Sequence, residues 1–174
     1  VSTIQIILIF KIFFGVDYPM KNLGKISLIV LFLFSIFVGS FTVYSINKVQ
    51  SYGTLINYLG IVRGATQRLI KLELQHQPHD ELIAYIDDII YDLKNTDGKY
   101  GLEKIPNADY QQQFSALTTL WHRVKSNIYA MRQNPANSPL LLQSSEVHFE
   151  IANNTVFAAD NYTTSKSHQL TLLS

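Results

Sequence analysis

Hydrophobic and polar positions divide the chain into one wholly apolar stretch and, after it, four segments of helical periodicity. Residues 26–46 read ISLIVLFLFSIFVGSFTVYSI and contain no charged residue. A helix of this length rises about 30 Å, which matches the hydrocarbon thickness of a bilayer. The stretch predicts a transmembrane helix; a buried core helix is the alternative interpretation.

The lysines on either side of the apolar stretch predict its orientation. They are Lys11, Lys21 and Lys25 before it and Lys48 close behind it. By the positive-inside rule, residues 1–25 are then cytoplasmic and residues 47–174 lie outside the cytoplasm. Met20 and Lys21 open a stretch that resembles a normal N-terminus, so we expect residues 1–19 to lie upstream of the native start.

Residues 47–174 contain four amphipathic helical segments. Their expected limits are the end of the membrane span to His76, Asp80 to Lys94, Tyr110 to about Met131, and a last helix starting at Ser138 or Pro139. The expected core positions are Tyr58, Val62, Ala65, Leu69 and Leu72, then Leu82, Ile83, Ile86, Ile89, Ile90 and Leu93, then Tyr110, Phe114, Leu117, Trp121, Val124, Ile128 and Met131, then Phe149, Ala152, Val156 and Ala159. Steps of three and four residues and mostly short connections predict an all-α fold, with the transmembrane helix continuing into an antiparallel four-helix bundle.

Composition and charge remove several classes of function. The net charge of +1 argues against a nucleic-acid partner, and the absence of cysteine excludes disulfides, thiol nucleophiles and cysteine zinc sites. We expect neither an enzyme nor a cofactor, because no histidine has a nucleophile or carboxylate at a recognisable catalytic spacing. His76 and His79 bracket Pro78 and are interpreted as a helix-end loop, with a metal site as the weaker alternative.

One face of the first extramembrane helix is a candidate binding site. At about 100° per residue, this face combines Asn57, Gly60, Gly64, Gln67 and Lys71, with Arg63 on one side and Arg68 at the other edge. Val62 and Leu69 fall on the opposite, core side. A solvated polar stripe is the alternative interpretation of this face.

The two glycines favour an interface over a solvated stripe. Each mid-helix glycine costs about 1 kcal/mol relative to alanine, and solvent gives nothing in return. A Gly60-xxx-Gly64 notch lets a second backbone approach closely. A second copy of the helix would bring two Arg63 side chains together, and an anion between them would remove their repulsion. We therefore predict a homodimer that holds a small anionic ligand, with Arg63 as its main contact and Arg68 bracing the site or pairing with an acid.

The spacing Ile56-Asn57-x-x-Gly60-x-x-Arg63-x-x-x-x-Arg68 resembles the first-helix motif of nitrate/nitrite-sensing histidine kinases. It is also similar to the N-terminal domain of type IV pili methyl-accepting chemotaxis transducers, and GIVRGATQRLIKLEL resembles sensor regions ahead of diguanylate cyclase or histidine kinase modules. The resemblance implies a periplasmic four-helix bundle between two membrane helices, with the residue at the position of Arg63 holding nitrate at the dimer axis. Gly64 departs from the methionine common after that arginine, so the ligand is left open.

These observations together predict the membrane anchor and sensory domain of a bacterial signal-transduction receptor. We expect it in the inner membrane, with the sensor domain in the periplasm or outside the cell. No second span or output module is found before Ser174, so we expect a fragment whose cytoplasmic output module is missing. The alternatives are a ligand-free structural dimerisation bundle and a truncated membrane-bound diguanylate cyclase or histidine kinase.

Overall fold

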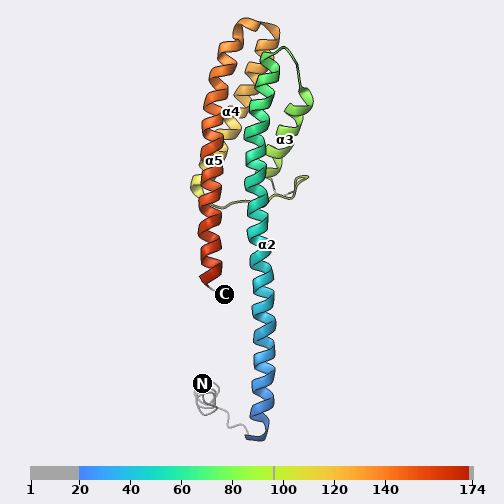
Figure 1. The fold of residues 1–174 in the computed structure, drawn as a ribbon, viewed down its shortest axis with the longest axis vertical. Helices are drawn as coiled ribbons and strands as arrows, with labels where there is room; N and C mark the ends of the chain where they lie inside the picture. Colours follow the sequence, from blue (N-terminus) through green and yellow to red (C-terminus); the bar gives the residue numbers. More distant parts are fainter. Residues whose placement is uncertain (1–19, 96, 173–174) are drawn as a thin grey trace. The chain divides into compact units, whose positions relative to one another are not determined.

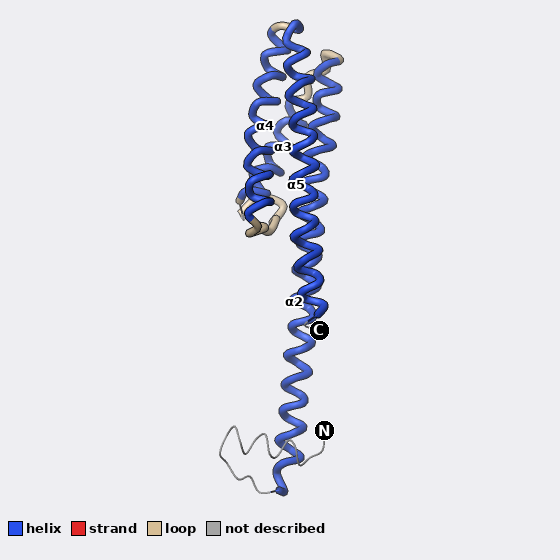
Figure 2. Tube along the Cα trace, turned by 90° about the vertical axis from the view of Figure 1, so that its left-hand side faces the viewer, coloured by secondary structure: helices blue, strands red, loops and turns tan. Residues whose placement is uncertain are grey.

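The computed structural model describes residues 20–95 and 97–172, and all of its regular structure within these ranges is helical. The elements are α2 (Met20–Leu74), α3 (Asp80–Lys94), α4 (Ala108–Gln133), the 3₁₀ turn η1 (Pro135–Asn137) and α5 (Ser138–Leu172) (Figure 1). The predicted all-α class is confirmed, and Figure 2 shows helices joined by loops, with no strand in the described ranges. The interpretation of residues 1–19 as non-native falls outside the described residues.

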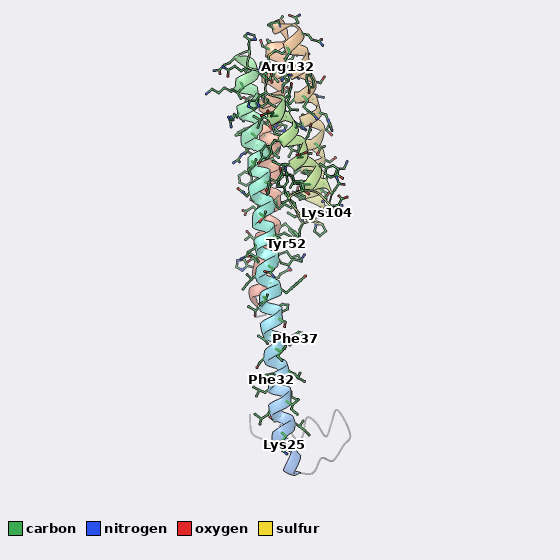
Figure 3. The ribbon with its side chains drawn as sticks, turned by 90° about the vertical axis from the view of Figure 1, so that its right-hand side faces the viewer. Lys25, Phe32, Phe37, Tyr52, Lys104 and Arg132 are labelled. Atoms are coloured by element: carbon green, nitrogen blue, oxygen red, sulfur yellow. The ribbon has the colours of Figure 1, made fainter. Side chains whose placement is uncertain are left out.

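The chain divides into two compact units, residues 1–44 and 45–174. In the first unit, α2 exposes large apolar side chains all round, such as Leu28 at 71% and Phe32 and Phe37 at 66% each (Figure 3). Such a surface is unfavourable in water and suited to lipid. Among the described residues, α2 is the one helix with a stretch long and apolar enough to cross a membrane.

In the second unit, apolar side chains from α2, α3, α4 and α5 contribute to one core. The prediction for α4 is confirmed at every position, and Trp121 in its middle is completely buried. On α3, Leu82 is only half-buried, while the other five expected residues are buried.

The predicted core faces of α2 and α5 need correction. On α5, Ala152 and Ala159 are buried as predicted. Phe149 is exposed and Val156 half-buried, whereas His148 and Thr155, each one position earlier, are buried. The buried imidazole lies beside Trp121 of α4, with ring centroids 6.2 Å apart.

On α2, the buried line is Leu55, Leu59, Val62, Thr66, Leu69 and Glu73, so the expected Tyr58, Ala65 and Leu72 are only half-buried. Tyr58 packs against Tyr100 instead, with ring centroids 4.7 Å apart. Periodicity found this helix but not its exact rotation, because several of its faces carry apolar residues.

The end of α2 is set by a backbone cap rather than by Pro78. His76 has a positive φ of 58°. Its N–H donates to the carbonyl of Glu73 at 2.9 Å, and the N–H of Gln77 donates to that of Leu72 at 3.0 Å. This is the Schellman pattern, which satisfies the last carbonyls of a helix. The helix therefore ends at Leu74, two residues before the predicted limit. His76 supplies the positive-φ position of this cap.

Arg132 of α4 forms ion pairs with a buried carboxylate of α2 and an exposed carboxylate of α3, near one end of the second unit. The guanidinium of Arg132 donates from Nε and Nη2 to the two carboxylate oxygens of Glu73, at 2.9 and 2.6 Å, and from Nη1 to Asp80 at 2.7 Å. Glu73 is 1% exposed and also accepts the backbone N–H of His79 at 3.1 Å. Hydrogen bonding to Glu73 raises the pKa of Arg132, so the guanidinium stays charged.

Candidate functional site

The predicted site residues all lie on α2, so they have the helical spacing that the sequence predicts. Asn57, Gly64 and Arg68 are exposed, whereas Gly60, Arg63 and Gln67 are half-buried. The opposite side carries the buried Val62 and Leu69, as predicted.

The two glycines face open space within the chain. A methyl group added at Gly60 or at Gly64 would meet no neighbouring atom within 4 Å. Packing inside one chain therefore does not require glycine at either position. Glycine at each position destabilises the helix by about 1 kcal/mol relative to alanine, and no contact among the described residues compensates for this loss.

Arg63 is held by a residue that the sequence analysis did not select. Its Nη1 donates to Oδ1 of Asn153, on α5, at 2.7 Å. In the described part of the chain no carboxylate forms a salt bridge with Arg63, although a guanidinium has five N–H donors. No sequence signal could have paired these residues, because 90 positions separate them and only the packing of α5 on α2 joins them.

Gln67 and Arg68, on the same helix, lack within the described ranges the hydrogen-bond or ion-pair partners that polar side chains usually have. The Nε2 of Gln67 is sealed from solvent and finds no hydrogen-bond acceptor in the described residues. Arg68 pairs with no acid there either, so of its two expected roles the ion pair is not observed. Neither Arg63 nor Arg68 therefore has a carboxylate partner among the described residues.

A buried imidazole lies in the core of the second unit. His148 is fully buried, and neither ring nitrogen has a hydrogen-bond partner in the described residues. Burial lowers its pKa from 6.5 to about 4, because the apolar interior disfavours the charged form. The sequence analysis found no catalytic spacing around this histidine, but it did not anticipate that the imidazole would lie in the core.

The neutral state of His148 predicts a specific pH dependence of folding. Between about pH 4 and pH 6.5 the unfolded chain binds a proton that the folded chain does not, so stability is complete above this window and falls as the pH drops through it. We expect this group to remove about 3 kcal/mol of unfolding free energy from neutral pH to about pH 4. Urea unfolding of the whole chain in detergent, followed by circular dichroism across this range, measures the effect.

The control for this pH effect is His148→Leu, which keeps a similar volume. The variant should be at least as stable as the parent at neutral pH, since it removes two unsatisfied polar atoms. Its stability should fall less steeply with acid. Parallel pH profiles for parent and variant would contradict the assignment of the effect to His148.

The groups suited to catalysis or metal binding are dispersed. His76 belongs to the cap of α2 and His79 directly precedes α3. Within the described ranges, no three His, Asp or Glu side chains gather as potential metal ligands. What the face on α2 offers is hydrogen-bond donors and positive charge beside an open notch, which suits noncovalent binding of an anion.

Comparison of the sequence with models of known protein families finds no match, and searches of curated proteins and of solved structures find none either. The resemblance to bacterial sensor domains therefore rests on the α2 motif alone.

Proposed function

We propose that this chain is the membrane anchor and sensory domain of a bacterial receptor, and that residues 45–172 form an antiparallel four-helix bundle. In this proposal α2 crosses the inner membrane at residues 26–46, and the bundle lies in the periplasm or outside the cell. Two copies associate along α2 and enclose a small anion between their Arg63 side chains. The signal passes along α2 toward a cytoplasmic output module.

One observation carries the proposal: a half-buried arginine without a carboxylate partner lies on the same helix surface as two glycines that face open space. In a dimer, these glycines allow the two helices to approach, which places the guanidinium groups near each other. An anion shared by both then supplies the missing negative charge. The lysines before the apolar stretch support the orientation.

An exposed aromatic side chain of α5 supports the proposed association. The contacts Arg63–Asn153 and Tyr52–Tyr162 support an antiparallel pairing of α2 with α5, in which Gly60 is about level with residues 154–156 and close to the level of Phe157. Phe157 is 64% exposed. An exposed phenylalanine level with an open notch favours a second protein surface, because its burial would add hydrophobic stabilisation to the dimer.

Oxyanion binding tests the role of Arg63. A ligand that binds only the folded protein raises its melting temperature. We expect nitrate or another small oxyanion to stabilise the parent chain in uncharged detergent. Arg63→Ala should abolish this stabilisation while leaving the fold intact. The control Lys71→Ala, an exposed cation on the same helix, should reduce it only modestly. If Arg63→Ala still responds like the parent, the anion site is elsewhere; if no oxyanion stabilises the parent, the ligand-free structural bundle is favoured.

Substitution of the glycines tests the dimer. Gly64→Leu places a large side chain in the notch, so we expect a weaker dimer in analytical ultracentrifugation of the detergent-solubilised chain. The stability of the single chain should not fall, because the position is open and leucine favours helix by about 1 kcal/mol over glycine. Thr54→Leu, at an exposed position of α2 ten residues before Gly64, is the control and should leave association unchanged. Equal association of all three proteins would contradict an interface at the glycines.

A further inference from the structure

A groove between the end of α3 and the first turns of α4 has the size of a small-molecule site. Its volume is about 440 Å³, within the ~300–1,000 Å³ typical of ligand pockets. It is lined by Leu93, Lys94, Lys104, Gln111, Phe114, Ser115, Thr118 and Thr119. None of these residues belongs to the α2 face described above.

Two lysines give the groove a positive charge that nothing in it neutralises. Lys94 ends α3, and Lys104 lies in the segment before α4 (Figure 3). No Asp or Glu is among the lining residues, and within the described chain neither lysine forms a salt bridge. This is unexpected by composition, because residues 79–109 contain eight acids and only three lysines.

The backbone that carries Lys104 is anchored on both sides. Leu102 and Ile105 are buried at 3% and 0% exposure. Glu103 accepts a hydrogen bond from Lys48 at 2.6 Å, and the backbone N–H of Tyr100 donates to the buried carboxylate of Asp92. The position of Lys104 at the groove is therefore set by packing, which limits the entropy that a ligand would have to remove.

Among the remaining lining groups, the side-chain amide of Gln111 donates to the carbonyl of Ile105 at 2.8 Å, and the others carry hydroxyls or are apolar. Thr118 and Thr119 donate their hydroxyl hydrogens to backbone carbonyls one turn earlier, at 2.9 and 3.0 Å, so they contribute mainly methyl groups to the groove. Leu93 and Phe114 are buried apolar residues behind it. The side-chain hydrogen bond at Ser115 uses its backbone carbonyl, which accepts from Thr119, so its hydroxyl can donate to a ligand.

We propose that this groove binds a small organic dianion, of the chemical class of aliphatic dicarboxylates. Two ammonium groups match two negative charges, a hydroxyl supplies a neutral donor, and the apolar walls suit a methylene spacer. Inorganic phosphate has the charge but no apolar part, and a neutral diamide has the shape but no charge. The site goes beyond the proposed anion site on α2 and does not depend on it, since the two share no residue.

Titration calorimetry of the whole chain in uncharged detergent tests the site, with succinate as the probe. We expect saturable binding of succinate, weaker binding of inorganic phosphate and no binding of succinamide. Lys94→Met and Lys104→Met keep the apolar stem and remove the charge, so each should raise the dissociation constant for succinate about tenfold or more.

Two control variants show whether the groove itself, and not a cation elsewhere on the chain, holds the dianion. Lys99→Met removes the third lysine of the segment, whose Nζ lies 5.4 Å from the ring centroid of Tyr100 and does not line the groove. This variant should bind succinate like the parent, whereas Arg63→Ala, in the separate site proposed on α2, reports any binding of succinate there. An absence of succinate binding to the parent, or an equal loss in Lys99→Met, would overturn the proposal. Loss only in Arg63→Ala would place the anion on α2 instead, and phosphate binding as tight as succinate would refute the role of the apolar walls.

Discussion

Arg132→Met should destabilise the second unit by about 3–5 kcal/mol, because it leaves the carboxylate of Glu73 buried without its partner. Glu73 is 1% exposed, and in the parent both of its oxygens accept hydrogen bonds from the guanidinium. Methionine fills much of the same volume, so the loss of charge rather than of packing dominates the result. Urea unfolding of the whole chain in detergent, followed by far-ultraviolet circular dichroism, measures the change.

Two companion variants separate the buried pair from its surroundings. The double variant Glu73→Leu/Arg132→Met removes both charges and should recover much of the loss, because no unpaired ion then remains inside. Asp80→Asn removes only the 74% exposed partner and should change stability by less than about 1 kcal/mol. If the double variant is no more stable than Arg132→Met, the energetic penalty does not come from an isolated buried carboxylate.

Trp121→Ala is the second large effect, with an expected loss of about 3–5 kcal/mol. The indole is fully buried in the middle of α4, and the methyl group of alanine leaves most of its volume as a cavity. In the parent its Nε1 also donates to Oδ1 of Asp87 at 2.7 Å, so the variant loses a hydrogen bond between α4 and α3. The same unfolding experiment measures the loss.

Trp121→Phe separates the cavity from the hydrogen bond. Phenylalanine keeps most of the buried ring, and Lys125 still donates to Oδ1 of Asp87 at 2.6 Å, so that carboxylate keeps a partner. We expect a loss clearly smaller than that of the alanine variant. A loss below about 1 kcal/mol for Trp121→Ala itself would show that α4 does not bury this position in solution.

The helices were largely predictable because their limits are local. Asp80 and Glu81 form the first turn of α3, where acidic side chains stabilise a helix. At the start of α4, the side chain of Asn107 accepts a hydrogen bond from the backbone N–H of Tyr110. The core face of α4 was also predictable, since one line of large apolar residues alternates with polar ones. The cap at His76 was not, because a positive φ at a histidine has no clear sequence signal.

The candidate site on α2 was only partly predictable. Helical spacing is a property of one segment, so the shared face of Asn57, Gly60 and Gly64 followed from the sequence. The hydrogen bond from Arg63 to Asn153 did not, because it depends on how α5 lies against α2. The groove beside Lys94 and Lys104 was missed for the same reason: its lining residues come from three consecutive segments whose approach depends on the buried Leu102 and Ile105.

By itself, the sequence determined the all-helical class, the apolar stretch at residues 26–46 and the polar face of α2, since each depends on periodicity or composition within one segment. Tertiary structure alone decided which side of α5 is buried, which carboxylate receives Arg132 and which lysines share a groove. These outcomes depend on the rotation and register of packed helices. In the packed unit His148 is fully buried beside Trp121 and Phe149 is exposed, an outcome that the residue pattern of α5 alone does not contain.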